Sequence, residues 1–316
     1  MYAITLADVQ AAANRIAVWA HRTPIMTCAT LDGIAGRSLF FKCEQWQKVG
    51  AFKFRGACNA VLKLSDADAK KGVVTHSSGN HAQALALAAK LRGIPAHIVM
   101  PSNATPVKRR AVEGYGAFVI ECEPTLIARE VTVAEVQKRT GAILIPPYNH
   151  ADVMAGQGTV ALEMLAEIPD LDAIVAPIGG GGLMAGVAIA AKGLKPALRL
   201  FAAEPLGADD AARSKTAGAL IQQTSPQTIA DGLLTSLGDL TWPVVRDLVE
   251  TVVTVQEEQI VQAMRFTWER AKLMIEPSSA VAVAAVMTPA FQGLQGMRKV
   301  GIVLSGGNVN LDRLPW

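Results

Sequence analysis

The sequence is 316 residues long, which corresponds to about two domains of ordinary size. Hydrophobic residues make up 51% of it and charged residues 18%, and this composition excludes an intrinsically disordered protein. The 30 Lys and Arg residues exceed the 27 Asp and Glu residues only slightly and are spread along the chain, so we expect neither nucleic acid nor an anionic membrane as a partner.

Short runs rich in Val and Ile alternate with longer Ala-rich helical patterns, which predicts an α/β protein with a parallel sheet covered by helices. The units of strand and helix between residues 69 and 149 read as a smaller inserted α/β domain. Residues 1–68 and 150–316 would then form the large domain. The expected strands, in chain order, are 38–42, 72–75, 96–99, 117–121, 143–145, 173–176, 199–203 and 299–304.

The four cysteines have no CxxC spacing, and the N-terminus has no signal-peptide pattern. Both features predict a cytoplasmic protein with reduced thiols. Two stretches without charge, 173–191 and 277–297, have the hydropathy of a membrane span. Glycines, prolines and polar residues interrupt them, so we expect buried core instead.

Four consecutive glycines follow an expected strand and precede a helical stretch: Gly179, Gly180, Gly181 and Gly182. Backbone N–H groups in such a loop can approach a phosphate closely, and the helix N-terminus adds a favourable dipole. With Ala185 the run also fits the dinucleotide pattern G-x-G-x-x-A, and Glu204 stands where a ribose ligand would be. An NAD-dependent oxidoreductase is therefore one interpretation, and a turn needed only for packing is another.

Lys53 lies between Phe52 and Phe54, just before a helical pattern over 57–64. A buried lysine loses its proton more easily, and the neutral amine can bond to an aldehyde such as pyridoxal phosphate, although a lone lysine is ordinarily a solvated surface group. Two further polar segments each follow an expected strand. One is Ser-Ser-Gly-Asn-His at 77–81, which could hold an anion or serve as an ordinary helix cap, and the other is Ser-Gly-Gly-Asn at 305–308.

Taken in order, Lys53, SSGNH, GGGG and SGGN resemble the fold-type II family of pyridoxal-phosphate enzymes, and the resemblance covers nearly the whole chain. Within that family, the segments AFKFRGA, THSSGNHAQAL, PPYNHADVMAGQGT, IEPSSAV and LSGGN are similar to the branch of serine racemase and of the serine, threonine and 3-hydroxyaspartate dehydratases. The resemblance implies a two-domain, tryptophan synthase beta-like fold: a large parallel-sheet domain with a smaller inserted domain.

The resemblance also implies roles for individual residues. Lys53 would carry the cofactor covalently and act as a catalytic base, and Ser78 would be the second base that racemases use on the opposite face. Ser305 would contact the pyridine nitrogen. The implied cofactor-binding residues are Phe52, Lys53, Asn80, Gly179, Gly180, Gly181, Gly182, Glu276 and Ser305. The implied substrate-binding residues are Ser77, Ser78, Gly79, Asn80, His81, Arg129 and Asn149.

The implied reaction removes the Cα proton and the β-hydroxyl of a β-hydroxy-α-amino acid, and water then gives a 2-oxo acid and ammonia. L-Threonine, L-serine, 3-hydroxyaspartate and a bulkier phenylserine-like amino acid all remain open as substrates. Serine racemase is the alternative activity, and the NAD-dependent oxidoreductase is the rival class. A homodimer is expected.

Two side features refine the resemblance. Glu204, the Ala208 carbonyl and Asp210 resemble the cation site of serine racemases, and such oxygen ligands suit Mg²⁺, Ca²⁺ or Mn²⁺. A solvated acidic turn is the alternative. Arg129 stands where serine racemases place an arginine that reaches the distal carboxylate of a substrate, although a surface arginine on an amphipathic helix would give the same pattern.

Overall fold

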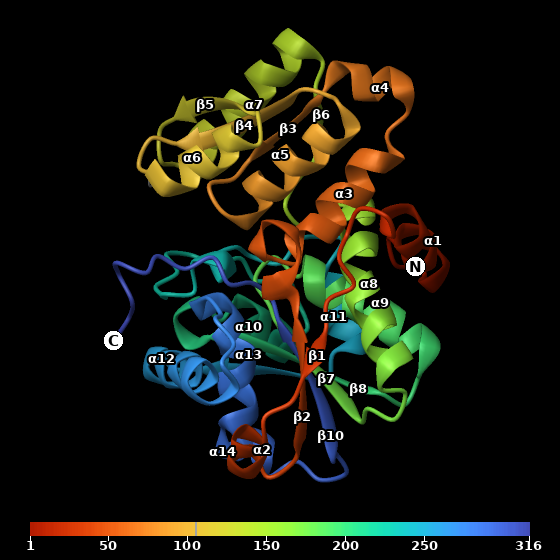
Figure 1. The fold of residues 1–316 in the computed structure, drawn as a ribbon, viewed down its shortest axis with the longest axis vertical. Coiled ribbons are helices and arrows are strands. Elements are labelled where there is room, and N and C mark those ends of the chain that lie inside the picture. Colours follow the sequence, from red (N-terminus) through yellow and green to blue (C-terminus); the bar gives the residue numbers. More distant parts are fainter. Residues whose placement is uncertain (105) are drawn as a thin grey trace.

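The computed structural model describes residues 1–104 and 106–316, and it contains two mainly parallel β-sheets (Figure 1). Within these residues the large sheet has six strands in the order β1-β2-β10-β7-β8-β9, and β1 alone runs antiparallel to its neighbour. Its strands are β1 (Ile25–Met26), β2 (Ser38–Cys43), β7 (Ala173–Pro177), β8 (Arg199–Pro205), β9 (Thr251–Val255) and β10 (Lys299–Leu304).

The small sheet has four parallel strands in the described chain, in the order β5-β4-β3-β6. They are β3 (Val73–His76), β4 (Ala96–Pro101), β5 (Phe118–Cys122) and β6 (Ile143–Leu144). Because α4 packs on β6, we call residues 66–144 the small lobe and the rest of the chain the large lobe. Figure 1 shows the small lobe above the large sheet.

Helices cover both sheets. Those outside the small lobe are α1 (Leu6–Ile16), α2 (Ala29–Ala35), α3 (Lys53–Lys63), α8 (Ala151–Glu167), α9 (Gly182–Leu194), α10 (Asp210–Ala217), α11 (Trp242–Leu248), α12 (Glu257–Phe266), α13 (Pro277–Met287) and α14 (Pro289–Gln292). Those of the small lobe are α4 (Asp66–Lys71), α5 (Asn80–Arg92), α6 (Pro106–Gly114) and α7 (Leu126–Thr140). Short turns of helix are η1 (Glu44–Trp46), η2 (Lys48–Gly50), η3 (Leu206–Ala208), η4 (Asp231–Leu233) and η5 (Thr267–Ala271).

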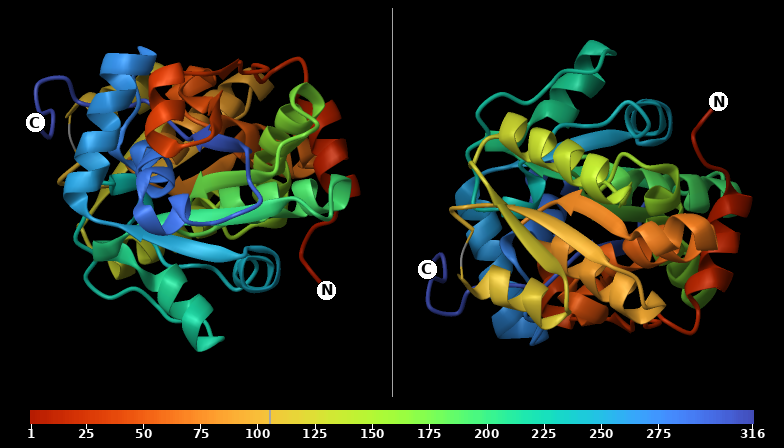
Figure 2. Two further views of the ribbon diagram at one scale, coloured as in Figure 1. Left: turned by 90° about the horizontal axis from the view of Figure 1, so that it is seen from below. Right: turned by 90° about the horizontal axis from the view of Figure 1, so that it is seen from above.

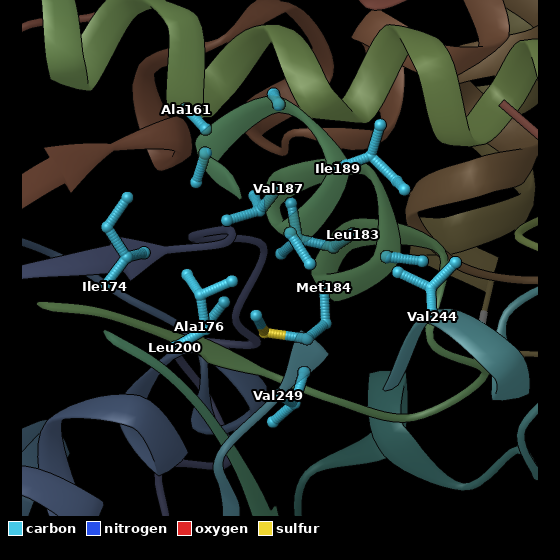
Figure 3. Close-up of a cluster of buried hydrophobic side chains, with 14 of the residues drawn as sticks. Ala161, Ile174, Ala176, Leu183, Met184, Val187, Ile189, Leu200, Val244 and Val249 are labelled. Atoms are coloured by element: carbon cyan, nitrogen blue, oxygen red, sulfur yellow. The ribbon is translucent and has the colours of Figure 1, made fainter. Parts of the chain in front are cut away.

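The large sheet is buried on both faces because alternate side chains of a strand point in opposite directions. On β7, Ile174 and Ala176 pack with residues of α8 and α9, as Figure 3 shows around Met184. Ala173 and Val175 pack on the other face with residues of α13. The helices therefore sandwich this sheet, as the view from below also shows (Figure 2, left).

The small lobe follows the same rule. On β3, Val73 packs with residues of α5, whereas Val74 packs with Val133 and Val136 of α7. Helix α3 packs against both α5 and α8, so it lies between the lobes. The domain boundaries at residues 69 and 149 stay a prediction.

All eight predicted strands are present within two residues of their expected ends. The sequence analysis missed β1, which has only two residues, and β9. In β9, at the edge of the sheet, two Thr residues interrupt the valines and only Val252 and Val255 are buried, so the apolar run is short. The stretch 173–191 forms β7 and most of α9, and 277–297 contains α13 and α14. No helix in the described residues is long and apolar enough to cross a membrane.

Candidate active site

Lys53 is the first residue of α3, between the two lobes. Two backbone contacts fix the chain just before it: Ala51 bridges Gly306, and the Phe52 N–H donates to the Ser305 carbonyl at 3.0 Å. The predicted helix at 57–64 therefore begins earlier, at Lys53 itself. Its Nζ donates to the Pro147 carbonyl at 2.7 Å and lies 5.2 Å from the centroid of the Phe52 ring.

A buried ion-pair network anchors α3. The Arg55 guanidinium donates to the carboxylates of Glu44 at 2.7 Å and Glu163 at 2.6 Å, and Lys42 donates to Glu163 at 2.6 Å. These partners lie in η1 and α8, and Lys42 lies in β2. Breaking a buried network of this kind is costly, so it holds the start of α3 firmly against the large lobe.

Burial lowers the pKa of Lys53 to about 8, although the nearby Glu276 carboxylate opposes the change. The unpaired N–H groups at the start of α3 also disfavour a cation there. About a tenth of Lys53 is consequently a neutral amine at pH 7, far more than for a lysine in water. This is the state that can act as a nucleophile or a base.

Glu276, the N-cap of α13, is buried beside this lysine. The Asn80 amide donates to both of its carboxylate oxygens, at 2.9 and 3.2 Å, and the Asn308 N–H donates to one of them at 3.0 Å. The Asn308 side chain in turn donates to the Asn80 amide oxygen at 2.8 Å. Burial raises the pKa of Glu276 to about 8, and Asp231 adds to the rise. Asn80, Glu276 and Asn308 thus join the two lobes in one polar network.

The SSGNH segment turns from β3 into α5, with Gly79 as the N-cap and Asn80 as the first helical residue. The His81 ring donates from Nε2 to the Ile145 carbonyl at 2.8 Å, and its Nδ1 has no partner in the described chain. Burial, with a contribution from the charge of Lys53, lowers the pKa of His81 to about 3. The loop therefore offers neutral donors and a helix N-terminus where an anion can bind.

The glycine run connects β7 to α9, and Gly181 takes a left-handed conformation with φ 84°. Tyr148 covers the run: a Cβ atom on Gly180 would lie 2.4 Å from its ring carbons. In the described residues, the backbone N–H groups of Gly179 to Gly182 have no protein acceptor, although the run is buried. Buried donors without a partner are costly unless a ligand accepts from them.

Two further acidic residues lie close together: Glu204 near the end of β8 and Asp210 at the start of α10. The Glu204 carboxylate accepts from the N–H groups of Ala212 at 2.6 Å and Ala211 at 3.2 Å, and Asp210 accepts from Leu237 at 3.1 Å. Burial raises the pKa of Glu204 to about 8, with a contribution from Asp210, and burial also raises the pKa of Asp210 to about 6. In the described residues neither carboxylate forms an ion pair, although the charge of Arg213 opposes the rise at Asp210, and two such buried carboxylates form a donor set that suits a hard divalent ion.

The comparisons with known proteins bear directly on this geometry. Residues 16–306 match the family described as pyridoxal-phosphate dependent enzyme. The chain belongs to that family. Because pyridoxal phosphate defines this family, the match favours that cofactor over a dinucleotide as the ligand of the glycine run.

Individual relatives agree with the family match. The chain is 55% identical over 316 residues to a serine racemase of Arabidopsis thaliana, an alignment that covers 99% of this chain and 96% of the relative. It is 49% identical over 318 residues to a beta-hydroxyaspartate dehydratase of Paracoccus denitrificans, with 100% of both chains covered. A structure of maize serine racemase matches with a TM-score of 0.97 at 51% identity, over 98% of this chain and 95% of that one. The predicted fold-type II architecture is therefore confirmed.

The residues of this pyridoxal-phosphate-dependent enzyme fit the cofactor. The partnerless N–H groups of the glycine run suit a phosphate, and the buried Lys53 amine suits an aldehyde. Pro147 and Tyr148 connect the two places, since the Pro147 carbonyl accepts from Lys53 and the next residue packs on Gly180.

The structure brings five of the predicted site residues together in one connected set, through contacts already described. They are Phe52, Lys53, Asn80, Glu276 and Ser305. The sequence analysis did not select Asn308 or Tyr148, although both stand in segments that carried the resemblance. Their importance depends on contacts with residues far away in the chain, which no local pattern reveals.

Two predicted substrate-binding residues, Arg129 and Asn149, lie outside this connected set. Arg129 in α7 lies close enough to His76 and Cys122 to lower the pKa of each, and its Nε has no hydrogen-bond partner in the described chain. It therefore stands near the start of the SSGNH loop. The Asn149 amide is engaged by the segment after η4, since it donates to Asp239 at 2.6 Å and accepts from the Leu240 N–H at 3.0 Å.

Proposed function

We propose that the protein is a pyridoxal-phosphate-dependent dehydratase that converts a small β-hydroxy-α-amino acid into a 2-oxo acid and ammonia. The substrate belongs to the class of L-threonine, L-serine and 3-hydroxyaspartate. The observation that carries this proposal is the buried Lys53, whose low pKa and fixed position suit both attachment of the cofactor and transfer of the Cα proton. The likeness to a beta-hydroxyaspartate dehydratase along the full chain supports it.

When bound, pyridoxal phosphate supplies an electron sink for the pair that remains on Cα after the proton leaves. The N–H groups of Gly179 to Gly182 would hold its phosphate, and Phe52, Asn80 and Ser305 would line the place of its ring. Ser305 would offer the pyridine nitrogen a neutral hydroxyl, which cannot protonate that nitrogen as a carboxylic acid would. The cofactor would then delocalise the Cα electron pair less strongly, which would favour loss of the β-substituent.

The chain's own residues position the substrate and move its proton. The N-terminus of α5 in the Ser77–His81 loop binds the substrate carboxylate, which orients the amino acid. Neutral Lys53 takes the Cα proton onto Nζ. The His81 ring stays neutral because of its low pKa, so it adds no second cation beside the reacting centre. Arg129 supplies a charge for the distal carboxylate of an acidic substrate.

Serine racemase activity is the second candidate, favoured by the 55% identity to a plant serine racemase. Racemisation needs a proton donor on the face of the substrate opposite Lys53. Ser78 in the SSGNH loop takes that role. Dehydration of an L-amino acid needs only the lysine face, so the two activities separate on mutation of Ser78.

We also propose three properties of the whole molecule. Glu204, the Ala208 carbonyl and Asp210 bind Mg²⁺, Ca²⁺ or Mn²⁺, supported by the two buried carboxylates. The protein forms a homodimer, supported by the exposed apolar side chains of Trp46 and Met274. The third property is a cytoplasmic location.

The test uses purified protein loaded with pyridoxal phosphate. Borohydride should fix the cofactor covalently on Lys53, as peptide mapping would reveal, and Lys53→Ala should abolish both the fixation and the turnover. A panel of L-serine, L-threonine and 3-hydroxyaspartate, assayed for 2-oxo acid and for the enantiomer of the remaining amino acid, distinguishes dehydratase from racemase. Protein that binds NAD and releases no 2-oxo acid from any member of the panel would refute the proposal.

A further inference from the structure

An ion pair joins the two lobes beside the glycine run. Lys108 of α6 in the small lobe donates to the Asp231 carboxylate of η4 in the large lobe at 2.7 Å. The other ion pairs formed by described residues of the small lobe, such as Arg109 with Glu113, stay within residues 66–144. In the described chain, Lys108–Asp231 is therefore the ion pair that crosses between the lobes.

The large-lobe partner stands directly against the candidate active site. Within η4, the Gly232 N–H donates to the Ser278 hydroxyl at 2.9 Å, two residues after Glu276. A Cβ atom on Gly179 would lie 3.0 Å from the Leu233 Cα, so η4 packs on the glycine run. Both charges of the pair also reach Glu276, since Asp231 raises its pKa and Lys108 lowers it.

The segment that follows η4 returns to the same glycines. The Thr241 hydroxyl donates to the Gly180 carbonyl at 2.9 Å. Between these points, the Asn149 side chain contacts Gly238 and accepts from the Leu240 N–H. Residues 231–241 thus touch the glycine run at both of their ends, and a displacement of Asp231 shifts groups that position the phosphate-binding loop.

We propose that the Lys108–Asp231 pair is a latch that holds the small lobe closed over the glycine run, which makes both residues positioning residues for the reaction. This inference rests on the proposed function. Closure of a lobe excludes water and completes a catalytic site. The side chains are 36% and 59% exposed, and a pair so exposed is weak, which lets it break and form again as substrate and product pass.

The experiment compares loaded wild-type enzyme with Lys108→Ala, Asp231→Asn, the double variant and the conservative Lys108→Arg. Arg109→Ala is the matched control, because Arg109 lies on the same helix but pairs inside the small lobe. The readouts are KM and kcat for L-serine dehydration, and hydrogen–deuterium exchange of residues 106–114 and 231–241. The exchange readout does not depend on turnover.

We expect each single variant to raise KM by roughly two- to fivefold, with a smaller change in kcat, and to speed exchange in both segments. The double variant should be no worse than either single variant, because both remove one interaction. Lys108→Arg and Arg109→Ala should resemble the wild type. Salt at 0.5 M should raise KM of the wild type but not of Lys108→Ala, since salt screens an exposed pair.

Additive effects in the double variant, or exchange in 231–241 that is unchanged by Lys108→Ala, would overturn the latch. An enzyme that releases no 2-oxo acid contradicts the proposed function instead, and the exchange measurements then still decide whether the pair closes the lobes.

Discussion

Replacing Gly180 by alanine tests the packing that shapes the phosphate-binding loop. The new Cβ atom would lie 2.4 Å from three carbons of the Tyr148 ring. Carbon atoms in contact are ordinarily about 3.5–4.0 Å apart, so the ring or the loop would have to move by about 1 Å. Overpacking of this kind destabilises a core by roughly 1–3 kcal/mol. We expect Gly180→Ala to cost that much in the free energy of unfolding and to weaken cofactor binding.

The assay is urea unfolding of the cofactor-free protein, followed by titration with pyridoxal phosphate. Gly33→Ala is the matched control, because an added Cβ there meets nothing within 4 Å on the exposed helix α2. That change should stabilise the protein by about 0.4–1 kcal/mol, the opposite sign. In a Tyr148→Ala background, the cost of Gly180→Ala should fall by at least about 1 kcal/mol, since the obstructing ring is gone.

The reasoning fails if Gly180→Ala is as harmless as Gly33→Ala. It fails equally if the cost of Gly180→Ala is the same with and without the Tyr148 ring, because the clash would then not be its cause.

Four further predictions concern single residues. The Glu276 pKa is raised from 4.5 to about 8, so the folded protein keeps a proton that the unfolded chain releases. The stability of wild type relative to Glu276→Gln should therefore fall as pH rises from about 5 to 8, by at most about 1.4 kcal/mol per pH unit, and parallel urea melts at several pH values would check this. Chelation of divalent ions should lower the melting temperature, Mg²⁺ should restore it, and Asp210→Ala should remove the response. Arg129→Ala should reduce kcat/KM for 3-hydroxyaspartate more than for threonine, and equal losses would exclude a role in side-chain recognition. Ser78→Ala should suppress D-serine formation by roughly 10²- to 10⁴-fold while it spares much of L-serine dehydration, as chiral analysis of both products would reveal.

The sequence predicts the layers of this fold well, because a strand that is buried on both faces is a continuous run of apolar residues. The run from Ala173 to Pro177 is apolar throughout, and the four glycines follow it directly. The position of the SSGNH loop at the end of β3 follows from the same logic, since ligands bind where parallel strands end. Lys53 follows no strand directly, and its aromatic neighbours and the helix after it are what point to it. The resemblance then supplies chemistry that periodicity alone cannot.

Other parts of the site depend on contacts between residues far apart in the chain. Lys53 donates to a carbonyl 94 positions away, and Asn80 meets a carboxylate 196 positions away. No local sequence pattern reveals a contact between residues that are so far apart in the chain. Helix α3 begins at Lys53 because the Ser305 carbonyl and Gly306 hold the preceding residues, which come from the other end of the sequence. Arg129 shows the same limit, because its described neighbours His76 and Cys122 lie in the small lobe and its distance from the large lobe depends on how the lobes meet.

The order of strands has a consequence for synthesis of the protein. β10 lies between β2 and β7 in the large sheet, yet it leaves the ribosome after both of them. Until residue 304 emerges, both neighbours present an open edge, and Phe52 lacks the carbonyl that fixes it before the lysine. Open apolar edges invite aggregation. A chain that stops before residue 299 lacks Ser305 and Asn308 of the candidate site, and we expect it to aggregate more readily than the full sequence.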